Sequence, residues 1–199
     1  MLRSLRVSLL LFALLSAAAS CGSRQAPPIL APKDRARELY EEGRARAEAG
    51  RWAEARDKHA EAFQLFPHWQ IAGALGLAEL HTKEHRDAAE HIALFLEQAP
   101  AEEVTVAERK EMADHLATAR ARVGVLILAV ADGAEIQIDG QLVGTTPLKR
   151  PLFVKPGRHT VDGALGGRRS TSTVLAMAGA KHTIRLDLTA KQGSGQPPR

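Results

Sequence analysis

Two histidines and a glutamate, His81, Glu84 and His85, form the group of side chains most capable of chemistry in this sequence. Two imidazoles four residues apart on one face of a helix can bind zinc, and a nearby glutamate can then activate the bound water as a general base. A working site would also need a third ligand. The three residues therefore carry one hypothesis, a metal-dependent enzyme.

The string from His81 to His85 matches the inverted zinc-protease pattern, His-x-x-Glu-His. An internal repeat, described below, places this string across a turn between two helices, which would break the required helical geometry. We therefore expect polar turn residues here and no metal site. Two further histidines, His59 and His91, fall within helical segments and are expected on helix surfaces.

The first 20 residues have the layout of a secretory signal peptide. Met1 to Arg6 carries two arginines, Val7 to Leu15 is apolar, and Ser16 to Ser20 contains small residues. The apolar run is shorter than the ~20 residues that a membrane-spanning helix needs. We therefore expect residues 1–20 to be removed on export.

The stretch Ala18-Ala19-Ser20-Cys21-Gly22 resembles the lipobox of bacterial lipoproteins. The resemblance implies that the Cys21 thiol receives a diacylglycerol and that the new terminal amine is acylated, although position −3 holds Ala18 where leucine is commoner. Two or more acyl chains anchor a protein stably. Gly22, in place of aspartate, implies sorting to the outer membrane, facing the periplasm. The alternative is an ordinary signal peptide followed by a chance cysteine.

Other catalytic patterns are missing from the sequence. Cys21 is the only cysteine, so neither a disulfide nor a free thiol nucleophile is expected. Ser170 and Ser172 lie in an expected strand without a Gly-x-Ser-x-Gly elbow, and Gly166-Gly167 lies between strands instead of before a helix. We expect no enzymatic activity and no cofactor.

The segment that follows the cysteine predicts a tether. Residues 21–33 form the lipidated N-terminus and a stretch with three prolines and no helical period, which indicates extended chain. Removal of Arg3 and Arg6 with the signal peptide lowers Lys+Arg from 27 to 25, against 23 Asp+Glu. With this near-neutral balance and no basic stripe, nucleic-acid binding is not expected.

A 33-residue repeat organises the next part of the chain. Apolar residues at helical spacing predict two antiparallel helices in each unit, with turns at Gly50-Arg51-Trp52 and Lys83-Glu84-His85. A capping-box signature, Thr105 to Glu108, predicts a fifth helix that closes the stack over residues 34–122. The residues that recur 33 positions later are Gly43, Ala55 and Pro67, as Gly76, Ala88 and Pro100.

The first unit resembles the tetratricopeptide repeat, whereas the second lacks the glycine and the aromatic residue at its turn. The resemblance implies a protein- or peptide-binding face lined by the first helix of each unit. The residues that carry the resemblance are Gly43, Gly50, Trp52, Ala55, Ala62 and Pro67. The residues implied at the binding face are Arg37, Tyr40, Arg44, Gln70 and His81.

From Val123 onward the hydrophobic period changes to that of strands. Asp139-Gly140 is a tight-turn dipeptide, and further turn signals follow at Thr146-Pro147, Lys155-Pro156-Gly157, Gly166-Gly167 and Ala178-Gly179. This spacing predicts a small antiparallel β-sandwich over residues 123–189, followed by a disordered tail over residues 190–199. The expected fold class is α+β, with two helix pairs and a capping helix before the sandwich.

The β unit resembles the PEGA domain family, small β-sandwich modules of bacterial envelope and surface proteins. The strings AEIQIDGQLVGTTPL, VKPGRHTV and AGAKHTIRLDL carry the resemblance, which covers about residues 124–188. Its characteristic positions are turn residues, so they report a fold and not an active site. They are Asp139, Gly140, Gly144, Thr146, Pro147, Pro156 and Gly157.

These features predict a lipid-anchored envelope protein that binds a partner protein or peptide without catalysis. The alternative is a structural envelope protein whose β unit binds peptidoglycan or surface polysaccharide. Sugar binding usually uses exposed aromatic rings, and Phe153 is the only aromatic residue from Val123 onward. The metal-dependent enzyme at His81, Glu84 and His85 is the third hypothesis.

Overall fold

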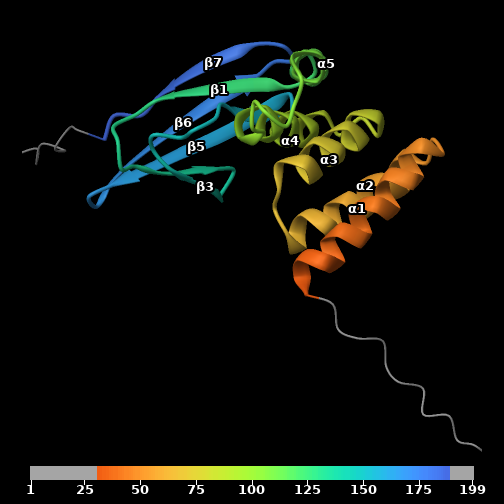
Figure 1. Cartoon of the computed structure of the whole chain (residues 1–199). Coiled ribbons are helices and arrows are strands. Elements are labelled where there is room, and N and C mark those ends of the chain that lie inside the picture. The colour runs from red at the N-terminus through yellow and green to blue at the C-terminus, as the bar shows by residue number, and fades with distance from the viewer. Residues whose placement is uncertain (1–30, 189–199) are drawn as a thin grey trace, which may run out of the picture.

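The computed structural model describes residues 31–188, in which five helices precede seven strands (Figure 1). The predicted signal peptide, the predicted lipid attachment at Cys21, residues 21–30 of the predicted tether and the predicted tail lie outside these residues. No helix within residues 31–188 is both long enough and apolar enough to cross a membrane.

The helices form two antiparallel hairpins and a fifth helix, as the repeat predicted. Helix α1 begins at Pro32, slightly earlier than expected, because proline suits the first turn, where its missing N–H would have no intrahelical partner. The predicted capping box is present, with Glu108 N donating to Thr105 Oγ1 at 3.2 Å and Thr105 N donating to Glu108 Oε2 at 2.8 Å. The helices are α1 (Pro32–Glu48), α2 (Trp52–Leu65), α3 (Trp69–His81), α4 (His85–Gln98) and α5 (Val106–Arg120).

The two hairpin turns have the same backbone conformation. Gly50 and Lys83, 33 positions apart, adopt left-handed φ values of 73° and 67°. The residue after each donates its N–H to the carbonyl five positions earlier at 2.8 Å, which is the pattern of a left-handed helix C-cap. Lys83 therefore adopts in the second turn the left-handed conformation that Gly50 adopts in the first, although its Cβ atom makes this conformation sterically less favourable.

The expectation that His59 lies on a helix surface is wrong. Its side chain is 2% exposed and lies against Gly43, where a Cβ atom would stand 2.5 Å from the His59 ring. The glycine leaves a space between α1 and α2 that the imidazole fills. His91 is also partly buried, with Nδ1 placed 2.8 Å from the buried carboxylate of Glu79. Helical periodicity alone does not reveal a small residue on the opposing helix.

The strands form two sheets that enclose a common core, which confirms the α+β class with a C-terminal β unit. The sheet orders are β4-β1-β7 and β3-β2-β5-β6. All strand pairs are antiparallel except β1 and β7, which are parallel because the chain crosses from β6 to the other sheet before β7 begins. The strands are β1 (Gly124–Ala129), β2 (Glu135–Ile138), β3 (Gln141–Thr145), β4 (Leu152–Val154), β5 (Gly157–Leu165), β6 (Arg168–Ala176) and β7 (Lys181–Arg185).

A single hydrophobic cluster joins the helices to the β unit. Ile92 and Phe95 of α4 and Met112 of α5 belong to the same buried cluster as Val125 and Phe153 of the β unit. Helices α4 and α5 consequently lie next to the sandwich, and α1 and α2 lie farther from it (Figure 1). This shared core holds α4 beside β3 and β4, the outer strands of the two sheets.

Candidate functional site

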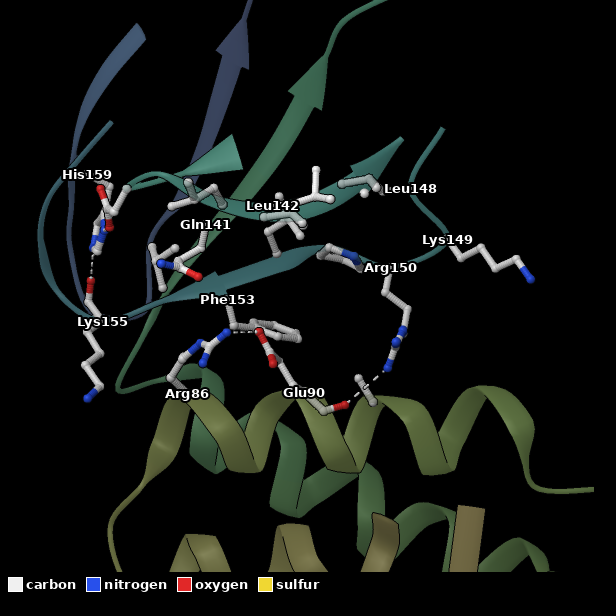
Figure 2. Close-up of a pocket in the computed structure, with 18 of the residues that line it drawn as sticks. Arg86, Glu90, Gln141, Leu142, Leu148, Lys149, Arg150, Phe153, Lys155 and His159 are labelled. Atoms are coloured by element: carbon white, nitrogen blue, oxygen red, sulfur yellow. Dashed lines mark hydrogen bonds and ion pairs between the residues drawn. The ribbon is translucent and has the colours of Figure 1, made fainter. Parts of the chain in front are cut away.

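A pocket of about 850 Å³ lies between α4, β3, β4 and the segment that connects the two strands (Figure 2). Strand β3 is the outer strand of the four-stranded sheet, and β4 is the outer strand of the three-stranded sheet. Both sheets therefore end at this pocket. We call it the edge pocket, and its volume is in the range of ligand-binding sites.

The wall formed by β3 presents apolar side chains to solvent. Leu142 is 65% exposed and Val143 is 37% exposed, and both line the pocket. All residues from Gln141 to Thr145 line it, although successive side chains of a strand point to opposite faces. The pocket therefore faces the edge of β3 and not one face of the sheet.

Cationic side chains stand around the edge pocket. Arg86 of α4 donates to Asp87 and Glu90, each at 2.8 Å, and Arg150 lies 3.1 Å from Glu97. In contrast, neither Lys149 nor Lys155 has an ion pair with another described residue. Across residues 123–188 the sequence has eight lysines and arginines against five aspartates and glutamates.

Arg150 also fixes the position of the connecting segment. Its guanidinium donates to the backbone carbonyl of Glu90 at 3.4 Å, in addition to its ion pair with Glu97. Figure 2 shows Arg150 reaching down to α4 while Arg86 and Glu90 point up from the helix toward the strands. The helix and the β3–β4 segment thus form the two sides of one site.

His159 lies at the rim of this site, with both ring nitrogens facing hydrogen-bond acceptors. Burial acts to lower its pKa, but hydrogen bonds from its ring to Asp139 and to the carbonyl of Lys155 outweigh burial, and the pKa is raised. Nδ1 lies 2.6 Å from Asp139 Oδ2 and Nε2 lies 2.7 Å from the Lys155 oxygen. Both partners are acceptors, so the protonated ring, which donates from both nitrogens, suits this geometry.

Glu90 is the acidic side chain that α4 contributes to the edge pocket. Burial raises its pKa, and the neighbouring Arg86 acts in the opposite direction. The pocket lining has four lysines and arginines, Arg86, Lys149, Arg150 and Lys155, against two carboxylates, Glu90 and Asp139. The balance of charge around the pocket is therefore positive.

The residues predicted to form a partner-binding face are spread over α1 and α3, and none of them lines the edge pocket. Arg37 and Arg44 are exposed on α1, and Arg44 pairs with Glu41 at 2.8 Å. Tyr40 is half-buried, with its ring 5.4 Å from that of His59, and burial raises its pKa. Gln70 and His81 lie near opposite ends of α3.

The His81–His85 string spans a turn, as the repeat predicted. His81 ends α3 and His85 begins α4, so the two imidazoles do not share one helix face. The His81 ring stacks on the Trp52 ring with 3.7 Å between the ring centroids, and Glu84 forms an ion pair with Arg56. Within residues 31–188, no group of three histidine, cysteine, aspartate or glutamate side chains is placed to hold a metal ion.

The edge pocket could not be predicted from the sequence because its lining comes from separate parts of the chain. One local signal was present: two adjacent large apolar residues, Leu142 and Val143, follow the Asp139-Gly140 turn and Gln141 in a five-residue strand. Comparisons of the chain with protein-family models, with curated proteins and with solved structures found no match.

Proposed function

We propose that this protein is a lipid-anchored component of the bacterial envelope that binds a partner protein through the edge pocket, without catalysis. The observation that carries the binding role is the exposure of Leu142 and Val143 on the wall of an 850 Å³ pocket. Exposed apolar side chains in a pocket rimmed by polar groups are typical of interaction sites. A shared core between α4 and the β unit would keep such a site preformed.

The anchoring role depends on the sequence. Cys21, the small residues before it and the proline-containing stretch after it support a lipid anchor and a tether. The resemblances to tetratricopeptide repeats and to the PEGA family support an envelope scaffold of the same kind. In this proposal the tether holds the helices and the sandwich away from the lipid, and the edge pocket faces the periplasm.

Glycan binding by the β unit gains no support from the described residues. Phe153, the aromatic residue of that unit, is 4% exposed and packs in the cluster shared with the helices. An aromatic ring in that position cannot stack on a sugar. We therefore favour a protein partner.

Lipid attachment is tested by labelling cells with radioactive palmitate. The wild-type chain should take up label and partition with membranes, whereas the Cys21→Ser variant should do neither, because it lacks the thiol. Equal labelling of both chains would refute attachment at Cys21. Release of unlabelled wild-type protein into the periplasm would refute the anchor itself.

Partner binding is tested by replacing Leu142 with a photoreactive amino acid in the anchored chain and irradiating intact cells. The control places the same group at Val106, which is 88% exposed at the start of α5 and does not line the pocket. A discrete protein adduct at position 142 and none at 106 is the expected result. No adduct at 142, or the same adducts at both positions, would refute the proposal.

A further inference from the structure

We propose that the edge pocket binds an extended, acidic segment of the partner, which pairs with β3 as an additional strand. This inference rests on the proposed function, since it names the chemistry of the partner at the same site. It follows from three features of the pocket: an open strand edge, an exposed apolar wall and cations at both ends.

The free edge of β3 offers backbone hydrogen bonds. Thr146 N donates to the Ala134 oxygen at 2.9 Å, and the Thr146 oxygen accepts from Gly133 N at 2.8 Å, so both groups point toward the β2 side. Backbone groups of successive strand residues point to opposite sides. Thr145, which lines the pocket, therefore directs its N–H and C=O toward the open side, where an added strand would lie.

The length of β3 and its bulge limit the added ladder. Five residues, Gln141–Thr145, at ~3.3 Å per residue give an edge of roughly 17 Å. The register shifts opposite Ile136 and Gln137, where Val143 is the extra residue. Bulges at edges discourage continuous pairing between sheets. A partner segment of about five residues, held by a few backbone hydrogen bonds and by side-chain contacts, fits this edge.

The side chains around the edge determine which segment binds. Leu142 and Val143 supply apolar contacts for alternate residues of the partner strand. Lys149 precedes β4 and Lys155 follows it, and Figure 2 shows them on opposite sides of the pocket. Neither is neutralised by an ion pair within the described part of the chain. A strand with carboxylates flanking apolar residues is complementary to this arrangement, whereas a lysine-rich strand is repelled.

A second copy of this chain is a poorer occupant. Pairing of β3 with the β3 strand of another copy would bring Lys149 and Lys155 of both chains together, and neither lysine has an ion pair within residues 31–188. Like charges brought together oppose association. We therefore assign the edge to an acidic partner.

The test uses the exported chain with Cys21→Ser and three fluorescent heptapeptides, with binding followed by anisotropy. The acidic probe is Thr-Val-Glu-Val-Glu-Val-Thr, the basic probe has lysine for glutamate, and the third has proline for the central valine. Only the acidic probe should bind, and the amide signals of Leu142 to Thr145 should shift on binding. Raising salt from 0.05 to 0.5 M should weaken binding about tenfold, because exposed charges are screened.

Charge reversal provides the matched comparison. The double substitution Lys149→Glu with Lys155→Glu should weaken binding of the acidic probe by at least about tenfold and should permit binding of the basic probe. The control, Lys181→Glu with Arg185→Glu on β7, makes the same charge change at exposed positions away from the pocket and should leave affinity unchanged. Circular dichroism checks that each variant is folded.

Three results of the probe and variant experiments would each overturn the inference. These are equal binding of the acidic and basic probes, equal effects of the two double substitutions, or amide shifts that miss β3. A dimer dissociated by Leu142→Asp would instead identify a second copy as the occupant. If position 142 still crosslinks to a protein in cells while no probe binds, the inference fails and the proposed function stands. If position 142 crosslinks to nothing, the proposed function itself fails.

Discussion

The buried imidazole of His59 makes the stability of the helical part depend on pH. His59 lies on α2 with its side chain 2% exposed, against Gly43 and 5.4 Å from the Tyr40 ring. Its Nδ1 has no hydrogen-bond partner among the described residues. Burial without a partner disfavours the charged ring and lowers the pKa of His59 to about 4.

The sign and size of the effect follow from linkage. In the unfolded chain the His59 pKa returns to 6.5, so between pH 6.5 and about 4 the unfolded state binds a proton that the folded state does not. The free energy of unfolding therefore falls as pH decreases through this window. At 1.36 kcal/mol per pKa unit, the loss amounts to about 3 kcal/mol by pH 4.

The assay is urea unfolding of the wild type and of His59→Leu at pH 7.5 and at pH 4. The carboxyls whose pKa burial raises, Glu79 and Glu90, act in the opposite direction but are present in both proteins, so they cancel in the comparison. The wild type should lose about 3 kcal/mol more than the variant on acidification. In NMR spectra the His59 ring should not titrate above about pH 5. The same pH dependence in both proteins, or a His59 midpoint near 6.5, would refute the reasoning.

Three further predictions concern packing, a buried hydroxyl and a strained turn. Gly43→Ala should destabilise the protein by about 1–3 kcal/mol, because the new Cβ atom meets the His59 ring at 2.5 Å. In a His59→Ala background most of this cost should disappear. If the effects of the two substitutions on stability simply add, the clash is contradicted. Thr146→Val should lower the free energy of unfolding by about 1–3 kcal/mol, because the buried hydroxyl donates to the Ala131 oxygen at 2.6 Å and accepts from Ala134 N at 3.0 Å. The control, Thr145→Val at the exposed neighbouring position, should change stability little. Lys83→Gly should raise the free energy of unfolding by about 1 kcal/mol, since glycine adopts a φ of 67° without the steric penalty of a Cβ atom. A lower midpoint of thermal unfolding in the variant than in the wild type would contradict this.

Much of the helical part could be predicted because its signals are local. The capping box at Thr105, the break before Pro67 and the change of hydrophobic period at Val123 each depend on residues within a few positions of one another. Recurrence after 33 residues predicted two similar hairpin turns, and Lys83 adopts the same left-handed conformation as Gly50. Backbone preferences and caps act over one or two helical turns, so the sequence carries them directly.

Tertiary structure alone decided the other features, because they depend on residues that are distant in the chain. His59 is buried since Gly43 on another helix leaves space for its ring. The parallel pairing of β1 with β7 depends on the route that the chain takes between sheets. The edge pocket exists because the shared core places α4 beside two strand edges, so that Arg86 of α4 lines the same pocket as Leu142 and Lys149. Such contacts depend on shape and space between elements, which no local pattern encodes.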